Sequence, residues 1–294
     1  MADSNHLAQA RALVDELLEN ARSGAIIPVR LPGQIEAIAE ALARADDGQS
    51  ASSAPADDPP DLADYKRDQA EFMSTAIHEL RIPMTSIRGY ADMMNTPSLG
   101  ELNDMQRQFL ATIRTNTRRM EGLMQDVSDI SKIRGGTLKA NVKMDMFKNI
   151  ALHVEKAMQP VAEELQRGFV VDVPQGMPIL NTDGELLAKA LSKIVENGLR
   201  YSEDGAQVTL TAEADGSNLR VIVQDTGIGM TEDTLAHLGE LYYRADDDRV
   251  RNHKGSGLGL PIAFGIISLL DGTVQVDSTP EQGSTFYVTL AGMT

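Results

Sequence analysis

The sequence contains no cysteine and no tryptophan, and only 4% of its 294 residues are aromatic. A chain without cysteine has no disulfide framework, no thiolate metal site and no thiol nucleophile. Because this absence fits a reducing compartment, we expect the protein in the cytoplasm. Hydrophobic residues still make up 42% of the chain, and 14 residues are methionine. The core must therefore consist mainly of aliphatic side chains, as in many helical bundles.

The sequence also lacks long hydrophobic runs and an excess of basic residues. No stretch approaches the roughly 18 apolar residues that a membrane-spanning helix needs, and the N-terminus lacks the basic-then-apolar layout of a signal peptide. We therefore expect no membrane insertion. The net charge of −16 argues against nucleic acid as a partner. It favours a partner with a basic docking patch, or it serves solubility alone.

The first 64 residues divide into a helical segment and a linker. Residues 46–64 are rich in Asp, Ala, Ser and Pro and have no periodicity, which predicts a flexible acidic linker. Residues 1–45 hold two short helical patterns joined by a connector that contains the tripeptide RLP. This layout resembles a HAMP signalling module, and an unrelated helical dimerisation or docking segment is the alternative. Either segment is a place where a separate sensor protein could dock.

Residues 65–136 have the pattern of two long helices. The first has apolar residues seven apart, and the second has a heptad seam with a polar layer at Asn116. The seams consist of Met73, Leu80, Ile87 and Met94, and of Phe109, Ile113, Asn116, Met120, Leu123, Val127 and Ile130. Two helices cannot bury such wide stripes alone, so the sequence predicts an all-α hairpin that forms a four-helix bundle in a homodimer.

From residue 140 to 294 the pattern changes to alternating helices and strands. This order predicts an α/β sandwich, in which a mixed sheet carries helices on one face. The expected helices are 147–166, 183–199 and 258–270, and the expected strands are 169–173, 206–214, 218–226, 273–279 and 284–290.

Three short motifs in this region place glycine or polar residues where a strand or helix ends. In DTGIG, Asp225 can accept a hydrogen bond from an exocyclic amine, and Gly227 and Gly229 allow a close backbone approach. KGSGLG (254–259) precedes a helix, and a helix N-terminus offers free N–H groups to phosphates. Asn197 carries an amide oxygen of the kind that Mg²⁺ accepts. The glycine spacing matches neither a dinucleotide fingerprint nor a P-loop.

The order of these motifs, behind the helical hairpin, resembles the histidine-kinase branch of the Bergerat-fold ATPases. The segment FMSTAIHELRIP (72–83) is similar to the phosphoacceptor box of that family. The resemblance covers residues 65–292 and implies a two-component histidine kinase that takes its phosphoryl group from ATP with Mg²⁺. It implies His78 as the nucleophile, Glu79 as the base, Asn197 as the Mg²⁺ ligand and Asp225 as the adenine contact. The remaining implied nucleotide-binding residues are Arg200, Tyr201, Gly227, Gly229, Lys254, Gly255, Gly257, Leu258 and Gly259.

The periodicity of the first helix supports an accessible His78. With Met73, Leu80 and Ile87 at the centre of the apolar stripe, position 78 points nearly away from it. Periodicity alone is equally satisfied by an ordinary surface histidine. The nucleophilic role therefore comes from the resemblance.

Two positions depart from the family pattern. Lys193 stands where the gyrase and Hsp90 branches carry a water-activating glutamate, so the sequence disfavours ATP hydrolysis as the main activity. Ile82 stands where the family has a Thr or Asn that orients water for dephosphorylation of the partner. We expect autophosphorylation and transfer to an aspartate of a response-regulator receiver domain, with weak or no phosphatase activity. The alternatives are an anti-sigma-type serine kinase and a degenerate nucleotide-binding signalling scaffold.

Overall fold

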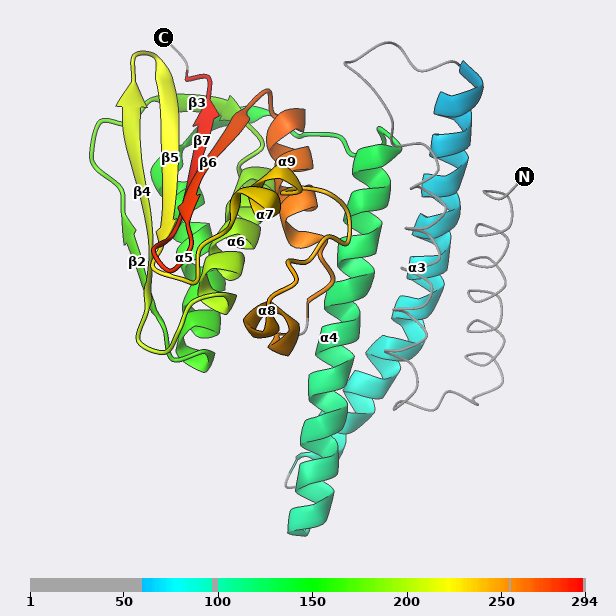
Figure 1. The fold of residues 1–294 in the computed structure, drawn as a ribbon. Helices are drawn as coiled ribbons and strands as arrows, with labels where there is room; N and C mark the ends of the chain where they lie inside the picture. Colours follow the sequence, from blue (N-terminus) through cyan, green and yellow to red (C-terminus); the bar gives the residue numbers. More distant parts are fainter. Residues whose placement is uncertain (1–59, 97–99, 254, 293–294) are drawn as a thin grey trace. The chain divides into compact units, whose positions relative to one another are not determined.

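The computed structural model describes residues 60–96, 100–253 and 255–292, which form two compact units divided between Thr137 and Leu138 (Figure 1). The HAMP-like segment expected at 1–45 and most of the expected linker lie outside the described residues. The first described helix begins at Pro60, so residues 60–64, which we assigned to the linker, are helical. Within the described ranges no helix has the length and hydropathy required to cross a bilayer.

The first unit is a hairpin of helices α3 (Pro60–Met94) and α4 (Asp104–Arg134). A capping box starts α4: the Asn103 side chain accepts from the Gln106 N–H at 2.9 Å, and Gln106 Oε1 accepts from the Asn103 N–H at 2.9 Å. Such reciprocal bonds satisfy two of the N–H groups that a helix start leaves free. This helical hairpin confirms the predicted all-α region.

Within one chain, the apolar stripes of α3 and α4 bury each other only in part. Met73 and Leu80 are buried as predicted, but Tyr90 is 68% exposed and Met94 lies at the exposed end of α3. Asn116 is half-buried and bonds to the Thr112 carbonyl of its own helix. The buried polar residues of α4 are instead Thr117, Ser128 and Asp129. The polar layer predicted at Asn116 is therefore not part of the core of a single hairpin.

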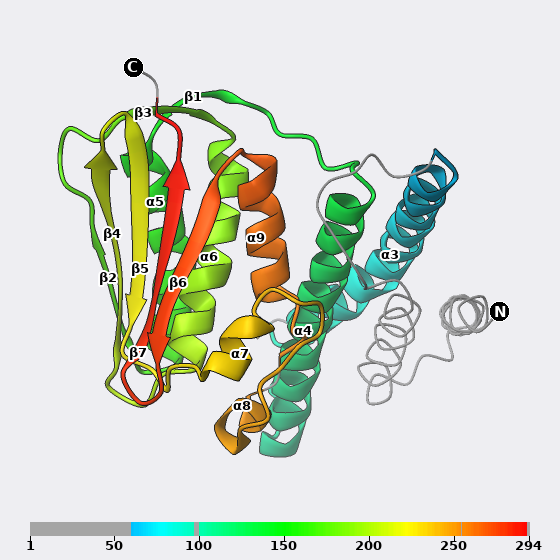
Figure 2. The same cartoon turned by 45° about the horizontal axis from the view of Figure 1, so that its top comes forward.

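The second unit contains the predicted mixed sheet, with strand order β2-β4-β5-β7-β6. β2 pairs parallel with β4, and the remaining neighbours are antiparallel. Figures 1 and 2 show the three longer helices of this unit on one side of the sheet. The strands are β2 (Gly168–Asp172), β4 (Gln207–Asp215), β5 (Asn218–Asp225), β6 (Thr273–Thr279) and β7 (Gly283–Leu290), and the helices are α5 (Phe147–Glu164), α6 (Gly184–Arg200) and α9 (Gly259–Leu269).

Four short elements were not predicted. Strands β1 (Lys143–Met146) and β3 (Ile179–Thr182) form a separate antiparallel pair. Each has only four residues, too few for an alternating pattern to stand out. Helices α7 (Glu232–Ala236) and α8 (Asp248–Asn252) lie between β5 and α9, in the segment that the sequence left without regular structure.

Candidate active site

Asp225 is the last residue of β5 and its carboxyl is buried, with the residue 8% exposed. Its Oδ1 accepts hydrogen bonds from the N–H groups of Gly227 at 2.9 Å and Ser284 at 3.2 Å. Burial raises the pKa of this carboxyl, and the two backbone bonds partly oppose that rise. Among the described residues nothing donates to Oδ2, so this oxygen can accept a bond from a ligand.

The loop after Asp225 fits between two other segments only because it contains glycine. A Cβ on Gly227 would lie 2.5 Å from the carbonyl oxygen of Tyr201, at the end of α6. Gly229 has φ +64°, and a Cβ there would lie 1.9 Å from the carbonyl oxygen of Thr279. The Ile228 N–H donates to the Tyr201 carbonyl at 3.0 Å. The loop is thus packed against both α6 and the turn between β6 and β7.

The last turn of α6 brings three predicted site residues to this loop. Asn197 is half-buried, and its side-chain amide has no hydrogen-bond partner in the described part of the chain. Arg200 donates from Nε and Nη2 to Glu196 Oε1, at 2.9 and 2.7 Å. The ring of Tyr201 meets that of His253 edge-on, with centroids 5.8 Å apart. Arg200 is therefore held within its own helix, whereas Asn197 is free to bind.

The predicted GSGLG segment approaches α6 from the other side. Gly257 has φ +71°, and a Cβ there would lie 2.6 Å from the Tyr242 backbone. Leu258 is buried and precedes the first residue of α9, Gly259, where a Cβ would lie 4.0 Å from Lys193 Cδ. A Cβ on Gly255 would lie 3.6 Å from the Tyr201 hydroxyl. Lys254 lies outside the described residues.

Residues 238–253, which we call the lid, lie between the DTGIG loop and the GSGLG segment; they hold basic side chains in internal contacts. The Arg244 guanidinium donates to the carbonyl oxygens of Val250 and His253. Arg251 pairs with Asp246 and with Asp248. Burial lowers the pKa of His253, and the charges of Arg167, Arg200 and Arg244 lower it further. These arginines therefore shape the lid in this conformation.

The structure thus brings most of the predicted nucleotide residues into one region, between α6, the DTGIG loop and the start of α9. Sequence reasoning missed Ser284, which donates to Asp225, and His253, which contacts Tyr201. It also missed Gly198, where a Cβ would lie 3.2 Å from Asp225 Cβ. Gly198 directly follows Asn197 in the sequence, so it could have been predicted together with Asn197. Ser284 and His253 could not, because their positions in the site depend on tertiary contacts.

His78 and Glu79 lie in the other unit, on α3. The His78 side chain is 72% exposed, and its Nδ1 lies 3.9 Å from Glu79 Oε1. That distance is too long for a hydrogen bond. Ile82, one turn further along, is 55% exposed. The orientation of His78 away from the apolar stripe is as expected from the periodicity.

Two protein families match the two units. Residues 68–136 match the His Kinase A (phospho-acceptor) domain. Residues 182–292 match the family described as histidine kinase-, DNA gyrase B-, and HSP90-like ATPase. The two matches follow one another in the order that the sequence motifs predict, and together they cover more than half of the chain.

Several histidine kinases resemble the whole described region. A sensor-like histidine kinase of Rhizobium meliloti is 27% identical over 253 residues, which cover 86% of this chain and 46% of that protein. Sensor histidine kinase GacS of Pseudomonas protegens is 30% identical over 229 residues, which cover 76% of this chain and 25% of GacS. The chain spans less than half the length of these relatives.

Solved structures agree with the sequence relatives. Full-length ShkA in complex with AMPPNP superposes with a TM-score of 0.65 at 26% identity, over 76% of this chain and 47% of ShkA. The Acinetobacter baumannii histidine kinase AdeS shares the fold with a TM-score of 0.52 at 20% identity, over 74% of this chain and 98% of that one. With its phospho-acceptor hairpin followed by this ATPase domain, the chain belongs to the sensor histidine kinases.

Proposed function

We propose that the protein binds ATP, phosphorylates itself on His78 and passes the phosphoryl group to an aspartate of a response-regulator receiver domain. The observation that supports this most is the buried Asp225 carboxyl beside the glycine-containing DTGIG loop, because no described residue donates a hydrogen bond to its Oδ2. An exocyclic adenine amino group is a donor that fits such an acceptor. The AMPPNP complex of the similar ShkA structure supports the same ligand class.

The remaining nucleotide contacts follow from the position of each segment around Asp225. Gly227 and Gly229 would lie against the base together with Tyr201. Gly255, Gly257, Leu258 and Gly259 would line the phosphate side, because the N–H groups that open α9 favour negative charge. Arg200 and Lys254 are the cationic side chains that we assign to the phosphates. Arg200 would exchange its bond to Glu196 for a phosphate oxygen.

We assign Mg²⁺ to Asn197. Within the described ranges no three His, Asp or Glu side chains converge as metal ligands. Mg²⁺ in such proteins is commonly held by one or two side chains together with substrate phosphates and water. The amide of Asn197, which has no hydrogen-bond partner among the described residues, fits that role. The cation would neutralise charge on the phosphates while the protein positions them.

The transfer step requires His78 to act as a nucleophile. Because Nδ1 faces Glu79, Nε2 is the nitrogen that would attack the γ-phosphorus. A new N–P bond forms, the bond from phosphorus to the β,γ-bridging oxygen breaks, and ADP leaves with that electron pair. The proton on Nδ1 would move toward the Glu79 carboxylate. The 3.9 Å separation must shorten for this, as often happens between free and substrate-bound sites.

We further propose that the protein has weak or no phosphatase activity. Ile82 is exposed one helical turn from His78, and its side chain has no polar atom that could orient water. Replacement by Thr supplies a hydroxyl at that place. The loss of label from a phosphorylated receiver should therefore be faster with Ile82→Thr than with wild type or Ile82→Leu. Efficient dephosphorylation by the wild type would contradict this proposal.

Incubation with γ-labelled ATP tests the proposed function against its alternatives. A histidine autokinase becomes labelled itself, with a phosphoryl bond that is acid-labile and base-stable. Acid-stable label on the serine of an added partner would indicate the anti-sigma-type kinase instead. Nucleotide binding without any label would indicate a signalling scaffold.

A further inference from the structure

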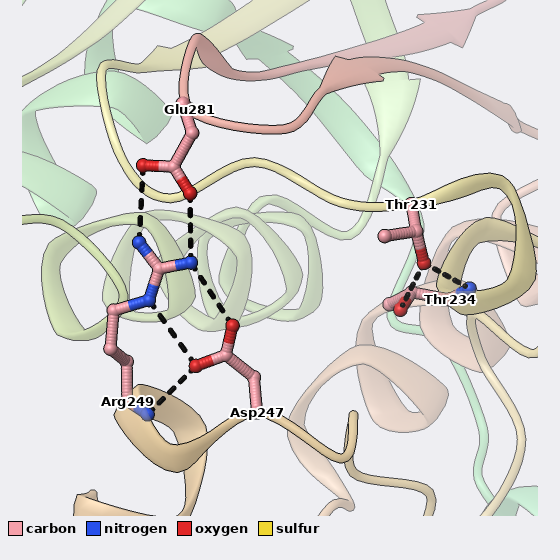
Figure 3. A network of polar contacts seen from close by, with 5 residues as sticks. All are labelled: Thr231, Thr234, Asp247, Arg249 and Glu281. Carbon is pink, nitrogen blue, oxygen red and sulfur yellow. Dashed lines mark hydrogen bonds and ion pairs between the residues drawn. The ribbon is translucent and has the colours of Figure 1, made fainter.

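Arg249 joins the lid to the turn between β6 and β7. Its guanidinium donates from Nη2 to Glu281 Oε1 at 2.9 Å and from Nη1 to Glu281 Oε2 at 3.2 Å. Arginine and carboxylate side chains form this bidentate geometry through two parallel N–H···O hydrogen bonds. Figure 3 shows Arg249 between Glu281 on one side and Asp247 on the other.

Asp247 orients the arginine toward Glu281. It caps the short helix α8 by accepting the Arg249 N–H at 2.8 Å. The same carboxylate accepts from Arg249 Nε at 3.2 Å and from Nη2 at 3.0 Å. The guanidinium is therefore held on its own helix, with both Nη atoms presented to the turn (Figure 3).

Glu281 is fixed relative to the candidate adenine site. Its N–H donates to the Ile228 carbonyl at 2.8 Å, so the turn bonds directly to the DTGIG loop. The Met230 N–H donates to Ser278 Oγ at 2.9 Å. Ser284, just beyond the turn, donates to Asp225. The carboxylate that receives Arg249 thus stands on the segment that also holds Asp225.

The other end of α8 contacts the opposite side of the same site. His253 follows α8 and meets the Tyr201 ring at the end of α6. Arg244 donates hydrogen bonds to the carbonyl oxygens of both Val250 and His253. The lid residues 247–253 are therefore attached to the DTGIG side through Arg249 and to the α6 side through His253.

We propose that the Arg249–Glu281 pair is a latch that holds the lid across the nucleotide and slows its release. This inference rests on the proposed function, because it assumes that ATP binds at Asp225. Both residues act as positioning residues, since neither needs to contact the nucleotide. The pair is exposed to solvent, so salt weakens it and lid movement can break and re-form it.

The direct test measures nucleotide release from the full-length chain. A fluorescent ATP analogue with a methylanthraniloyl group on the ribose is bound and then displaced by excess ATP in a stopped-flow instrument. We expect Glu281→Gln and Arg249→Gln each to release the analogue about two- to fivefold faster, the size expected for an exposed ion pair. The double variant should release it no faster than Arg249→Gln alone, because that change already removes the pair with Glu281.

A matched control removes the same charge elsewhere. Glu213 pairs with Arg220 at 3.2 Å on the β4–β5 hairpin, and its side chain is exposed. Glu213→Gln should leave the release rate unchanged.

Two further readouts separate a latch from a purely structural role. Raising the salt concentration should speed release from the wild type more than from Glu281→Gln, because only the wild type has the ion pair to lose. In autophosphorylation assays, Glu281→Gln should raise the KM for ATP with little change in kcat, because the chemistry at His78 is untouched. A damaged DTGIG loop would raise the KM as well, but it would also lower the free energy of unfolding.

The outcomes distinguish the latch from the function on which it rests. Wild-type or slower release from both variants, with nucleotide binding intact, would overturn the latch alone. If the wild type does not bind the analogue or ATP at all, the proposed function and the latch both fail.

Discussion

Burial and the proposed adenine contact favour different protonation states of the Asp225 carboxyl. In the proposed role Asp225 must be ionised to accept the adenine amino group well, but burial raises its pKa and so favours the neutral form. The folded protein takes up a proton on Asp225 more readily than the unfolded chain does. As the pH falls toward the raised pKa of Asp225, the contribution of Asp225 to folding stability therefore increases, and the affinity for the nucleotide should decrease.

The first prediction concerns this pH dependence. On acidification, we expect ATP affinity to begin to decline at a higher pH than it would if Asp225 had the pKa of an ordinary aspartate. Asp225→Asn should bind at least about tenfold more weakly at pH 7.5, since a bond to a charged group contributes about 1.5–3 kcal/mol. Titration calorimetry between pH 7.5 and 5 measures both effects. Because the ionisation of ATP affects wild type and Asp225→Asn equally, any difference between their pH profiles of ATP affinity comes from Asp225. Identical profiles would contradict the assignment of Asp225 to the adenine.

Gly229 is the second test at this scale. Gly229→Ala adds a Cβ at a positive φ and 1.9 Å from the Thr279 carbonyl oxygen. Gly216→Ala is a matched control, because Gly216 has nearly the same φ of +63° but no atom within 4 Å of its added Cβ. The control should lose about 1–2 kcal/mol for the left-handed backbone. Gly229→Ala should lose more stability in urea denaturation and should also bind ATP more weakly. Equal losses would show that the close approach is unimportant.

Among the helices and strands, α6 positions more of the site than any other described element. Asp183 caps its start: Oδ1 accepts from the N–H groups of Glu185 at 3.1 Å and Leu186 at 3.0 Å. Oδ2 accepts from the Asn141 N–H at 2.7 Å. One buried side chain therefore fixes the helix that ends at Asn197 and Arg200, and joins it to the segment before β1.

The third prediction removes this cap. Asp183→Ala should lower the free energy of unfolding by about 1–2 kcal/mol, since it removes the cap and leaves the N–H groups of Asn141, Glu185 and Leu186 without this acceptor. Urea denaturation followed by circular dichroism measures the change. Asp172→Ala, at an exposed position in the same unit, should have little effect. Similar stability of both variants would exclude an important cap.

Elements with a strong periodic pattern could be predicted from the sequence, and short ones could not. The helix expected at 183–199 is observed at Gly184–Arg200, and the five strands of the large sheet lie within a residue or two of their predicted ends. Strands β1 and β3 escaped because four residues show no clear alternation. Helix α8 is only five residues long and begins at a side-chain cap, in a charged run that has no apolar face.

The same contrast applies to the site. The order of the motifs predicted Asp225, Asn197 and the glycines as site residues, because each motif is contiguous in the chain. Glu281 and Ser284 lie more than fifty residues beyond Asp225 and carry no motif. Their roles depend on the pairing of β5 with β7, which places the β6–β7 turn beside the DTGIG loop.

For the whole molecule, the exposed apolar side chains of the hairpin indicate a homodimer. A single hairpin leaves large side chains on its surface that a four-helix bundle would cover. They include Tyr90, Met93, Met94, Met105 and Phe109. We therefore propose that the hairpin is the dimerisation surface.

The fourth prediction tests that surface by sedimentation equilibrium. The wild type should have twice the mass of the 31.8 kDa chain. Phe109→Glu should shift the equilibrium toward monomer by placing a charge in the interface. Leu152→Glu is the control, because Leu152 is 59% exposed like Phe109 but lies in the second unit. A monomeric wild type, or equal effects of both changes, would contradict the proposed interface.

The account depends most on His78, and the phosphorylation site can be identified directly. The full-length protein, His78→Gln and His153→Gln are incubated with γ-labelled ATP and Mg²⁺, and the retained label is tested in acid and in base. His153 is also exposed but lies on α5 of the second unit, so its replacement controls for the loss of a surface histidine. We predict acid-labile, base-stable label on the wild type and on His153→Gln, and none on His78→Gln. Undiminished label on His78→Gln would contradict the central claim.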